Sequence, residues 1–188
     1  MNKKGIIWIS AVIYIALGLV AVTIILSSSL PLINNLKDKA TYMQSKVVLY
    51  EIDKNIKEVI NEGPGSKRFI DTVIIKGGKL EFVSSANLLN EIKWFDTTQA
   101  TIVEPSEKGV CPNTSCIIIK EGDLNIYQEK TIIKDEYNLV AYLTYDKIRL
   151  LFDQASTQGP TDITGKFSLT IENQGIDNGQ VKLYIKVA

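Results

Sequence analysis

The first part of the chain is apolar almost without interruption. Residues 6–26 read IIWISAVIYIALGLVAVTIIL, which contains no charged residue, and its only polar residues are Ser10 and Thr23. At the helical rise of 1.5 Å per residue this segment spans about 31 Å, close to the hydrocarbon thickness of a bilayer. A helix that is apolar on every face is not stable in water. We therefore predict a helix over 6–26 that lies in lipid or in the core of a helical bundle.

A second helical pattern follows, in which apolar residues recur every three to five positions among charged ones. This pattern predicts an amphipathic helix over 32–62 that ends at Gly63-Pro64-Gly65. Pro31 removes one backbone hydrogen bond and should loosen the helix between its two halves. Residues 6–62 are thus expected to form one helix or two collinear pieces. The predicted apolar stripe of the second half consists of Leu36, Ala40, Met43, Val47, Ile52, Ile56 and Val59.

The rest of the chain, residues 66–188, has the pattern of short strands separated by turns. Gly77-Gly78 lies between two apolar runs, 68–75 and 80–83, and predicts a two-residue hairpin turn. Glu121-Gly122-Asp123 predicts a second hairpin, between 116–119 and 124–127. Residues 87–95 fit either a short helix or a strand.

The last two strands are the clearest. Residues 167–171 and 181–187 both alternate apolar and polar side chains, which predicts antiparallel strands with one apolar face, joined by the loop Asn173–Gly179. Residues 139–145 and 148–152 fit two strands better than one amphipathic helix. The predicted fold class is α+β: a long N-terminal helix followed by an antiparallel β-sheet or β-sandwich.

Composition argues against most kinds of chemistry. Lys plus Arg and Asp plus Glu are 21 each, so no basic surface for nucleic acid is predicted, and histidine is absent. No phosphate-binding glycine loop or nucleophile motif is present. We expect no enzyme activity, no catalytic or cofactor-binding residue, no cofactor and no metal site. Glu51 and Asp53 are interpreted as solvated surface charges, and Trp94 as a core residue.

The two cysteines, Cys111 and Cys116, enclose a short segment. In an extracytoplasmic domain they would form one disulfide that closes a tight loop, whereas in a reducing cytosol they would be free thiols. The loop also contains Asn113-Thr114-Ser115, which fits the acceptor pattern for N-glycosylation at Asn113. The same loop could therefore be cross-linked and glycosylated outside the cell.

The start of the chain indicates its orientation and suggests a family. Lys3 and Lys4 precede the apolar segment with no acidic residue beside them, which predicts a cytoplasmic N-terminus and a domain outside. The leader Met1–Gly5, followed at once by the apolar helix, resembles the class III signal peptide of type IV pilins and archaeal flagellins. The short leader is most similar to those of archaeal pilins. Ser10 departs from bacterial pilins, which usually have a glutamate at this position.

The resemblance implies a function. A prepilin peptidase would cut residues 1–5 between Gly5 and Ile6, with Lys3 and Lys4 as the basic residues upstream. The helix 6–26 would then serve first as a membrane anchor and later as the core of an extracellular filament built from copies of this chain or related pilins. Residues 66–188 would form the outer β-domain and carry any adhesive contacts.

Two other interpretations are compatible with the same pattern. A single-pass membrane protein could carry an extracellular β-domain that binds a partner and never polymerises. An extracytoplasmic enzyme is the third class, although no catalytic constellation supports it. The N-terminus of the mature protein separates the first two, since the pilin begins at Ile6 and the anchored protein keeps Met1.

Overall fold

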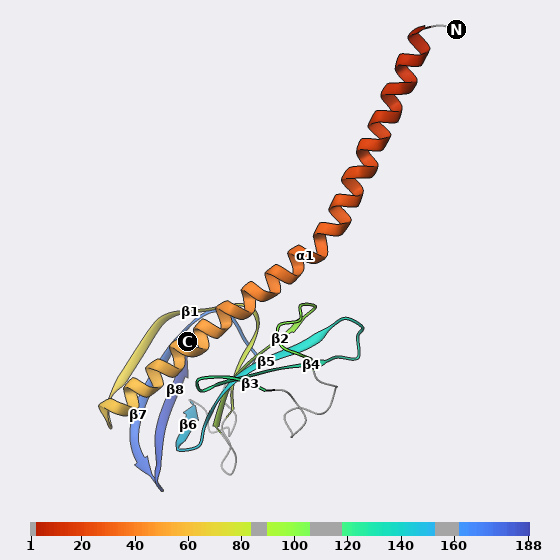
Figure 1. Ribbon diagram of the computed structural model, residues 1–188. Coiled ribbons are helices and arrows are strands. Elements are labelled where there is room, and N and C mark those ends of the chain that lie inside the picture. The colour runs from red at the N-terminus through yellow and green to blue at the C-terminus, as the bar shows by residue number, and fades with distance from the viewer. Residues whose placement is uncertain (1–2, 84–89, 106–117, 153–161) are drawn as a thin grey trace. The chain divides into compact units, whose positions relative to one another are not determined.

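A computed structural model describes residues 3–83, 90–105, 118–152 and 162–188, with side chains from residue 11 onward (Figure 1). In these ranges the chain forms one helix, α1, followed by a sheet of strands, which confirms the predicted α+β class. The elements are α1 (Lys3–Glu62), β1 (Lys67–Val83), β2 (Asn90–Thr98), β3 (Ile119–Glu121), β4 (Leu124–Lys130), β5 (Tyr137–Tyr145), β6 (Ile148–Phe152), β7 (Ile163–Asp177) and β8 (Gln180–Val187).

The chain divides into two compact units, Met1–Lys37 and Asp38–Ala188. The first contains the predicted apolar segment, and α1 passes through Pro31 without a break in its helical assignment. The second contains the remainder of α1 and the whole sheet, and its core lies between them. The prediction of one helix is therefore confirmed from Lys3 to Glu62.

The sheet has the order β3-β4-β5-β2-β1-β7-β8-β6, and its neighbours are antiparallel except for the parallel pair of β6 and β8. Only Asp146 and Lys147 connect β5 to β6, although these strands are far apart in that order. Three virtual bonds reach at most about 11 Å, so the sheet must curl until β6 returns beside the end of β5. Consistent with this curl, the Leu150 amide donates a hydrogen bond of 3.3 Å to Asn90 Oδ1 of β2.

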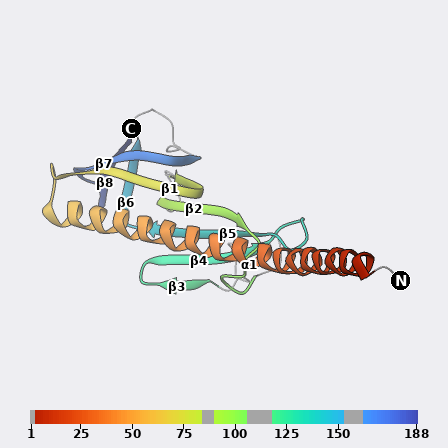
Figure 2. The ribbon, with the colours of Figure 1, turned by 90° about the horizontal axis from the view of Figure 1, so that it is seen from above.

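The second half of α1 lies over one face of the curled sheet (Figure 2). Ile52, Ile56 and Val59 are fully buried there, as their spacing predicted. The first half of the predicted stripe is wrong, because Leu36, Ala40, Met43 and Val47 are exposed. The reason is that this part of α1 has apolar residues on two sides, and spacing alone does not decide which side meets the sheet. The helix residues that do pack in the core are Tyr42, Val48, Leu49, Ile52, Ile56 and Val59.

Gly77 and Gly78 do not form the predicted hairpin. They lie inside β1, one strand of 17 residues that pairs with β7 through its first part and with β2 through its last part. A Cβ on Gly77 would lie 2.7 Å from Thr41 Cγ2, and one on Gly78 would lie 2.5 Å from the Phe95 carbonyl oxygen. The two glycines therefore allow a close approach of helix, strand and Trp94, and do not reverse the chain.

The remaining strand predictions have mixed outcomes. β7 and β8 pair antiparallel, with Leu169, Ile171, Leu183 and Ile185 buried, as the alternation predicted. The predicted loop Asn173–Gly179 is wrong, because β7 continues to Asp177 through an irregular register. Residues 90–98 are a strand, the hairpin of β3 and β4 is confirmed, and residues 139–145 and 148–152 are strands and not a helix.

Candidate functional site: the apolar surfaces of the N-terminal helix

The first unit presents apolar side chains on all sides of the helix. This helix is long and apolar enough to cross a membrane, and none of its most apolar window is buried within the chain. Tyr14, Leu19 and Ile24 point in different directions around the helix, yet they are 75%, 65% and 60% exposed. By length and composition, the segment is suited to an apolar surrounding that the single chain does not supply.

Four hydroxyl groups in and just after this segment are hydrogen-bonded within the helix itself. The hydroxyl of Thr23 donates to the Leu19 carbonyl oxygen at 2.8 Å, and that of Ser29 donates to the Ile25 carbonyl oxygen at 2.7 Å. Ser27 and Ser28 make similar bonds one turn back, the latter at 3.0 Å to the Ile24 carbonyl oxygen. These bonds lower the cost of placing four hydroxyl groups in an apolar medium.

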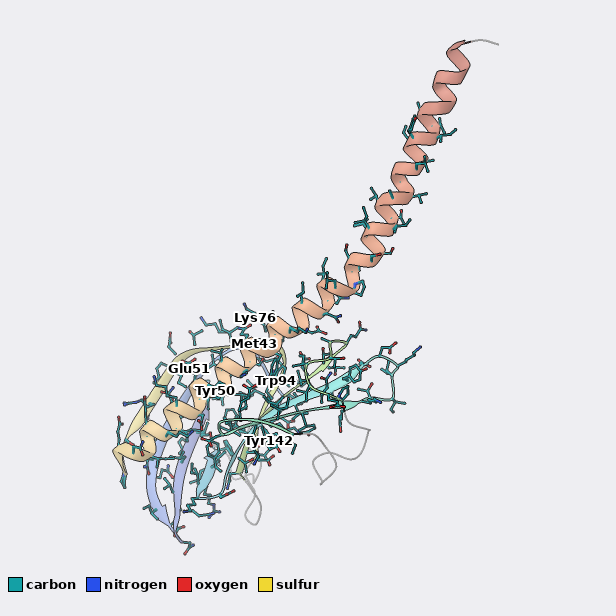
Figure 3. The ribbon with its side chains drawn as sticks, in the orientation of Figure 1. Met43, Tyr50, Glu51, Lys76, Trp94 and Tyr142 are labelled. Atoms are coloured by element: carbon teal, nitrogen blue, oxygen red, sulfur yellow. The ribbon has the colours of Figure 1, made fainter. Side chains whose placement is uncertain are left out.

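The second unit has a further stripe of exposed apolar side chains on α1. It consists of Met43, Val47 and Tyr50, which we call the outer stripe, and their exposed fractions are 54%, 62% and 36%. Tyr50 lies at the edge of this stripe, where its hydroxyl reaches the turn between β3 and β4. Their spacing of four and three residues places them on one face, opposite Leu49 and Ile52 (Met43 and Tyr50 are labelled in Figure 3). Such a face can bury its side chains against a second helix.

Polar contacts fix both ends of this part of α1 to the sheet. At its start, Asp38 Oδ2 accepts hydrogen bonds from the Thr98 hydroxyl at 2.7 Å and from the Gln99 amide at 3.1 Å. Near its end, the Asn173 side-chain amide donates to the Val59 carbonyl oxygen at 3.2 Å. The outer stripe is therefore held on a helix that is anchored to the sheet at both ends.

A buried carboxylate links the middle of the helix to the sheet. Asp53 is 6% exposed, so its interpretation as a solvated surface charge is wrong, whereas Glu51 is exposed as predicted. Asp53 Oδ1 accepts a hydrogen bond of 3.0 Å from the Tyr145 hydroxyl, and Lys57 Nζ lies 2.5 Å from Oδ2. Burial, together with the negative charge of Asp53, raises the pKa of the Tyr145 phenol above its ordinary value.

The turn between β3 and β4 forms a clamp over the same part of the helix. Lys46 pairs with Glu121, and the Tyr50 hydroxyl donates to the Glu121 carbonyl oxygen at 3.0 Å. Lys57 Nζ also lies 2.5 Å from Asp123 Oδ2. Two hydrogen bonds raise the pKa of the Lys57 ammonium group above its ordinary value, and the bond to Asp123 has a larger effect than the bond to Asp53. No spacing rule pairs residues 66 to 75 positions apart, so this clamp had no signal in the sequence.

The residues proposed from the sequence fall into two groups. Gly5 and Ile6, together with Lys3 and Lys4, lie in the first two turns of α1. The predicted disulfide of Cys111 and Cys116 and the predicted glycosylation site at Asn113 lie outside the described residues. Within the described part of the chain, no group of three or more acidic, histidine or cysteine side chains could hold a metal ion.

Comparison with known proteins adds no relative. No family model, no curated protein and no solved structure matches the chain. Any functional conclusion must therefore come from the two exposed apolar surfaces and from the sequence around them.

Proposed function

We propose that the chain is a pilin-like structural subunit of an archaeal type IV pilus-type surface filament. A prepilin peptidase cuts the precursor between Gly5 and Ile6, on the cytoplasmic side of the membrane. The apolar helix holds the subunit in the membrane, with the β-domain outside, until the subunit joins others of its kind. The β-domain then coats the filament and carries any adhesive contacts. The subunit has no catalytic role and needs no cofactor.

The exposed apolar surface of the first unit supports a helix that lies in lipid before assembly and among other helices afterwards. Its apolar side chains need lipid before assembly and other helices afterwards, because water is unfavourable for them at each stage. At about 25 cal/mol per Å² of apolar area, packing of several such helices offsets the entropy lost on association. Lipid alone satisfies this first surface, so it does not separate a filament subunit from a simple anchor.

The outer stripe is the observation that carries the proposal. Lys37, Asp38 and Lys39 follow the apolar segment, so Met43 and Val47 lie beyond the part of the helix that lipid would cover. A membrane anchor with a freely solvated domain has no use for these side chains on its outer face. In a filament, the helix of a neighbouring subunit would cover them, and each buried side chain contributes about 1.5–3 kcal/mol.

A single-pass anchored protein that never polymerises is the second candidate. The apolar surface of the first unit favours it equally, and the β-domain could then bind a partner of its own. This candidate predicts a chain that keeps Met1 and remains monomeric in the membrane. It gives no role to the outer stripe.

The two candidates are separated by the mature N-terminus and by the state of assembly. The full chain is expressed in an archaeal host that has a prepilin peptidase, and surface filaments and membranes are analysed by mass spectrometry. We expect a mature protein that begins at Ile6 and is present in filaments. Uncut monomers found only in membranes would refute the proposal.

A pair of variants tests the outer stripe. Val47→Asp should abolish filaments while leaving cleavage and membrane insertion unchanged, because a charge in the middle of the stripe cannot be buried between helices. Asn55→Asp adds the same charge on another side of α1 and should leave filaments intact. If both variants assembled equally well, the stripe would have no role in packing.

A further inference from the structure

The loop between β4 and β5 displays two isoleucines to solvent. Ile132 is 86% exposed, the highest value among the large apolar side chains in the described ranges, and Ile133 is 66% exposed. Charged residues surround them, with Lys130 on one side and Lys134 on the other. Two adjacent apolar side chains at a loop tip are costly unless something apolar covers them.

Hydrogen bonds within the loop hold its backbone in a conformation that leaves both isoleucines exposed. The Thr131 amide donates to the Glu136 carbonyl oxygen at 3.1 Å, which closes the loop, and the Ile133 amide donates to the Thr131 hydroxyl oxygen at 3.1 Å. Asp135 adopts a positive φ of 59°, which completes the reversal of the chain. The two isoleucines therefore sit on an internally bonded loop and project from it.

The loop lies at the same end of the second unit as Asp38 of α1. Tyr137, the first residue of β5, pairs with Lys130 on one side and with Thr98 on the other. The Thr98 hydroxyl in turn binds Asp38, the first residue of the second unit. In the sequence, Asp38 follows Leu26, the last residue of the apolar segment, by twelve residues, or about 18 Å of helix. The isoleucine loop thus lies at the end of the second unit from which the chain leads to the apolar segment.

We propose that, in the membrane-held subunit, this loop inserts Ile132 and Ile133 into the outer interface of the lipid bilayer. The inference rests on the membrane stage of the proposed function. A bilayer is favoured over a second copy of the chain because the chain leads from this end of the second unit into the apolar segment within twelve residues. Because the anchor already holds the subunit at the membrane, the loop meets lipid at a high effective concentration, and two apolar side chains are enough for insertion. Lys130 and Lys134 can extend toward the lipid headgroups.

Quenching of tryptophan by brominated lipid tests the insertion. The full chain with Trp8→Phe and Ile133→Trp is reconstituted in vesicles of brominated phosphatidylcholine. Trp94, which is 1% exposed in the core, supplies a constant background. We expect the emission of the new tryptophan to be lost in brominated vesicles and retained in unbrominated ones.

Ile176→Trp in the same Trp8→Phe background is the matched control. Ile176 is also highly exposed, at 72%, but its chain neighbour Gly175 lies near Pro64, at the opposite end of the domain part of α1. At 1.5 Å per residue, the 24 steps of α1 from Asp38 to Glu62 separate the two ends by about 36 Å. The control tryptophan should keep its emission in brominated vesicles.

The wild-type chain supplies a third arm that separates the two proposals. Its Trp8 should be quenched if the apolar helix spans the bilayer. Quenched Trp8 with an unquenched tryptophan at position 133 would overturn the loop insertion alone. Unquenched Trp8 would overturn both the membrane stage and the insertion. A tryptophan at position 133 that is shielded from aqueous iodide but not quenched by brominated lipid would indicate a protein contact and overturn the lipid proposal.

Discussion

The Tyr145 hydroxyl donates a 3.0 Å hydrogen bond to Oδ1 of Asp53, across the interface between helix and sheet. Asp53 is almost fully buried, and its second oxygen contacts Lys57, which also reaches Asp123 in the turn between β3 and β4. One carboxylate thus joins helix, sheet and clamp. Because it is a charged group inside the domain, the loss of either partner should be costly.

Removing the Tyr145 hydroxyl tests this link. Tyr145→Phe should lower the free energy of unfolding by about 1–3 kcal/mol, since it leaves one oxygen of a buried carboxylate without its donor. Trp94 fluorescence during urea unfolding of the full chain in detergent would measure the change. Tyr50→Phe removes a hydroxyl that binds at an exposed site and should cost less. Equal losses in the two variants would contradict a special role for the buried pair.

Stability should fall at alkaline pH. Burial raises the pKa of the Tyr145 phenol, and it raises the pKa values of Tyr42 and Tyr127 from 10.0 to about 12. The folded chain therefore holds these protons more tightly than the unfolded chain. Their contribution is complete below pH 10 and is lost as pH rises above it, by up to about 1.4 kcal/mol per pH unit for each phenol. Urea midpoints between pH 8 and 12 should fall less steeply for Tyr145→Phe than for the wild type.

Gly78 should not tolerate a side chain. It has a φ of +71°, and an added Cβ would lie 2.5 Å from the Phe95 carbonyl oxygen and 2.7 Å from Trp94 Nε1. Gly122 is the matched control, because it has a φ of +63° but open space around it. Gly122→Ala should cost about 1–2 kcal/mol from backbone strain alone. Gly78→Ala should cost clearly more, as measured by urea unfolding, and equal costs would show that the close approach is relieved without penalty.

The clamp predicts a difference between two lysines of the same helix. Lys57→Met removes the cation between Asp53 and Asp123, and we expect a loss of about 1–3 kcal/mol in unfolding free energy. Lys54 lies one turn earlier and is 3.9 Å from Glu58 at the surface. Lys54→Met should change stability by less than about 0.5 kcal/mol. Thermal unfolding of both variants at low and high salt would measure this difference, and similar losses would contradict the clamp.

The elements that could be predicted from the sequence are those whose pattern of apolar residues is compatible with only one secondary structure. Strict alternation in residues 167–171 and 181–187 requires one buried face, and the structure has it. The long helix was also predictable, because its signal does not depend on any partner. Both results depend on local chemistry, which a single sequence records directly.

The parts that the sequence did not predict depend on contacts between distant residues. Met43 and Leu49 are equally apolar, and only the sheet decides that Leu49 is buried and Met43 exposed. Gly77-Gly78 has the composition of a turn, but the neighbouring helix and Trp94 require it inside a strand. Asp53 resembles any surface charge until Tyr145, 92 positions later, reaches it. These features follow from tertiary packing, for which a local pattern carries no signal.

The uninterrupted β1 has a consequence for how the domain opens. Its residues 67–75, together with Leu80, pair with β7, and residues 79–83 pair with β2. Leu80 belongs to both ladders, because it pairs with Trp94 of β2 and with Ile163 of β7, and it is fully buried, so the two halves of the sheet are coupled through this residue. Amide protons of β2 and β7 should therefore exchange with solvent in one cooperative event. Under a pulling force, each such domain would then unfold as one unit.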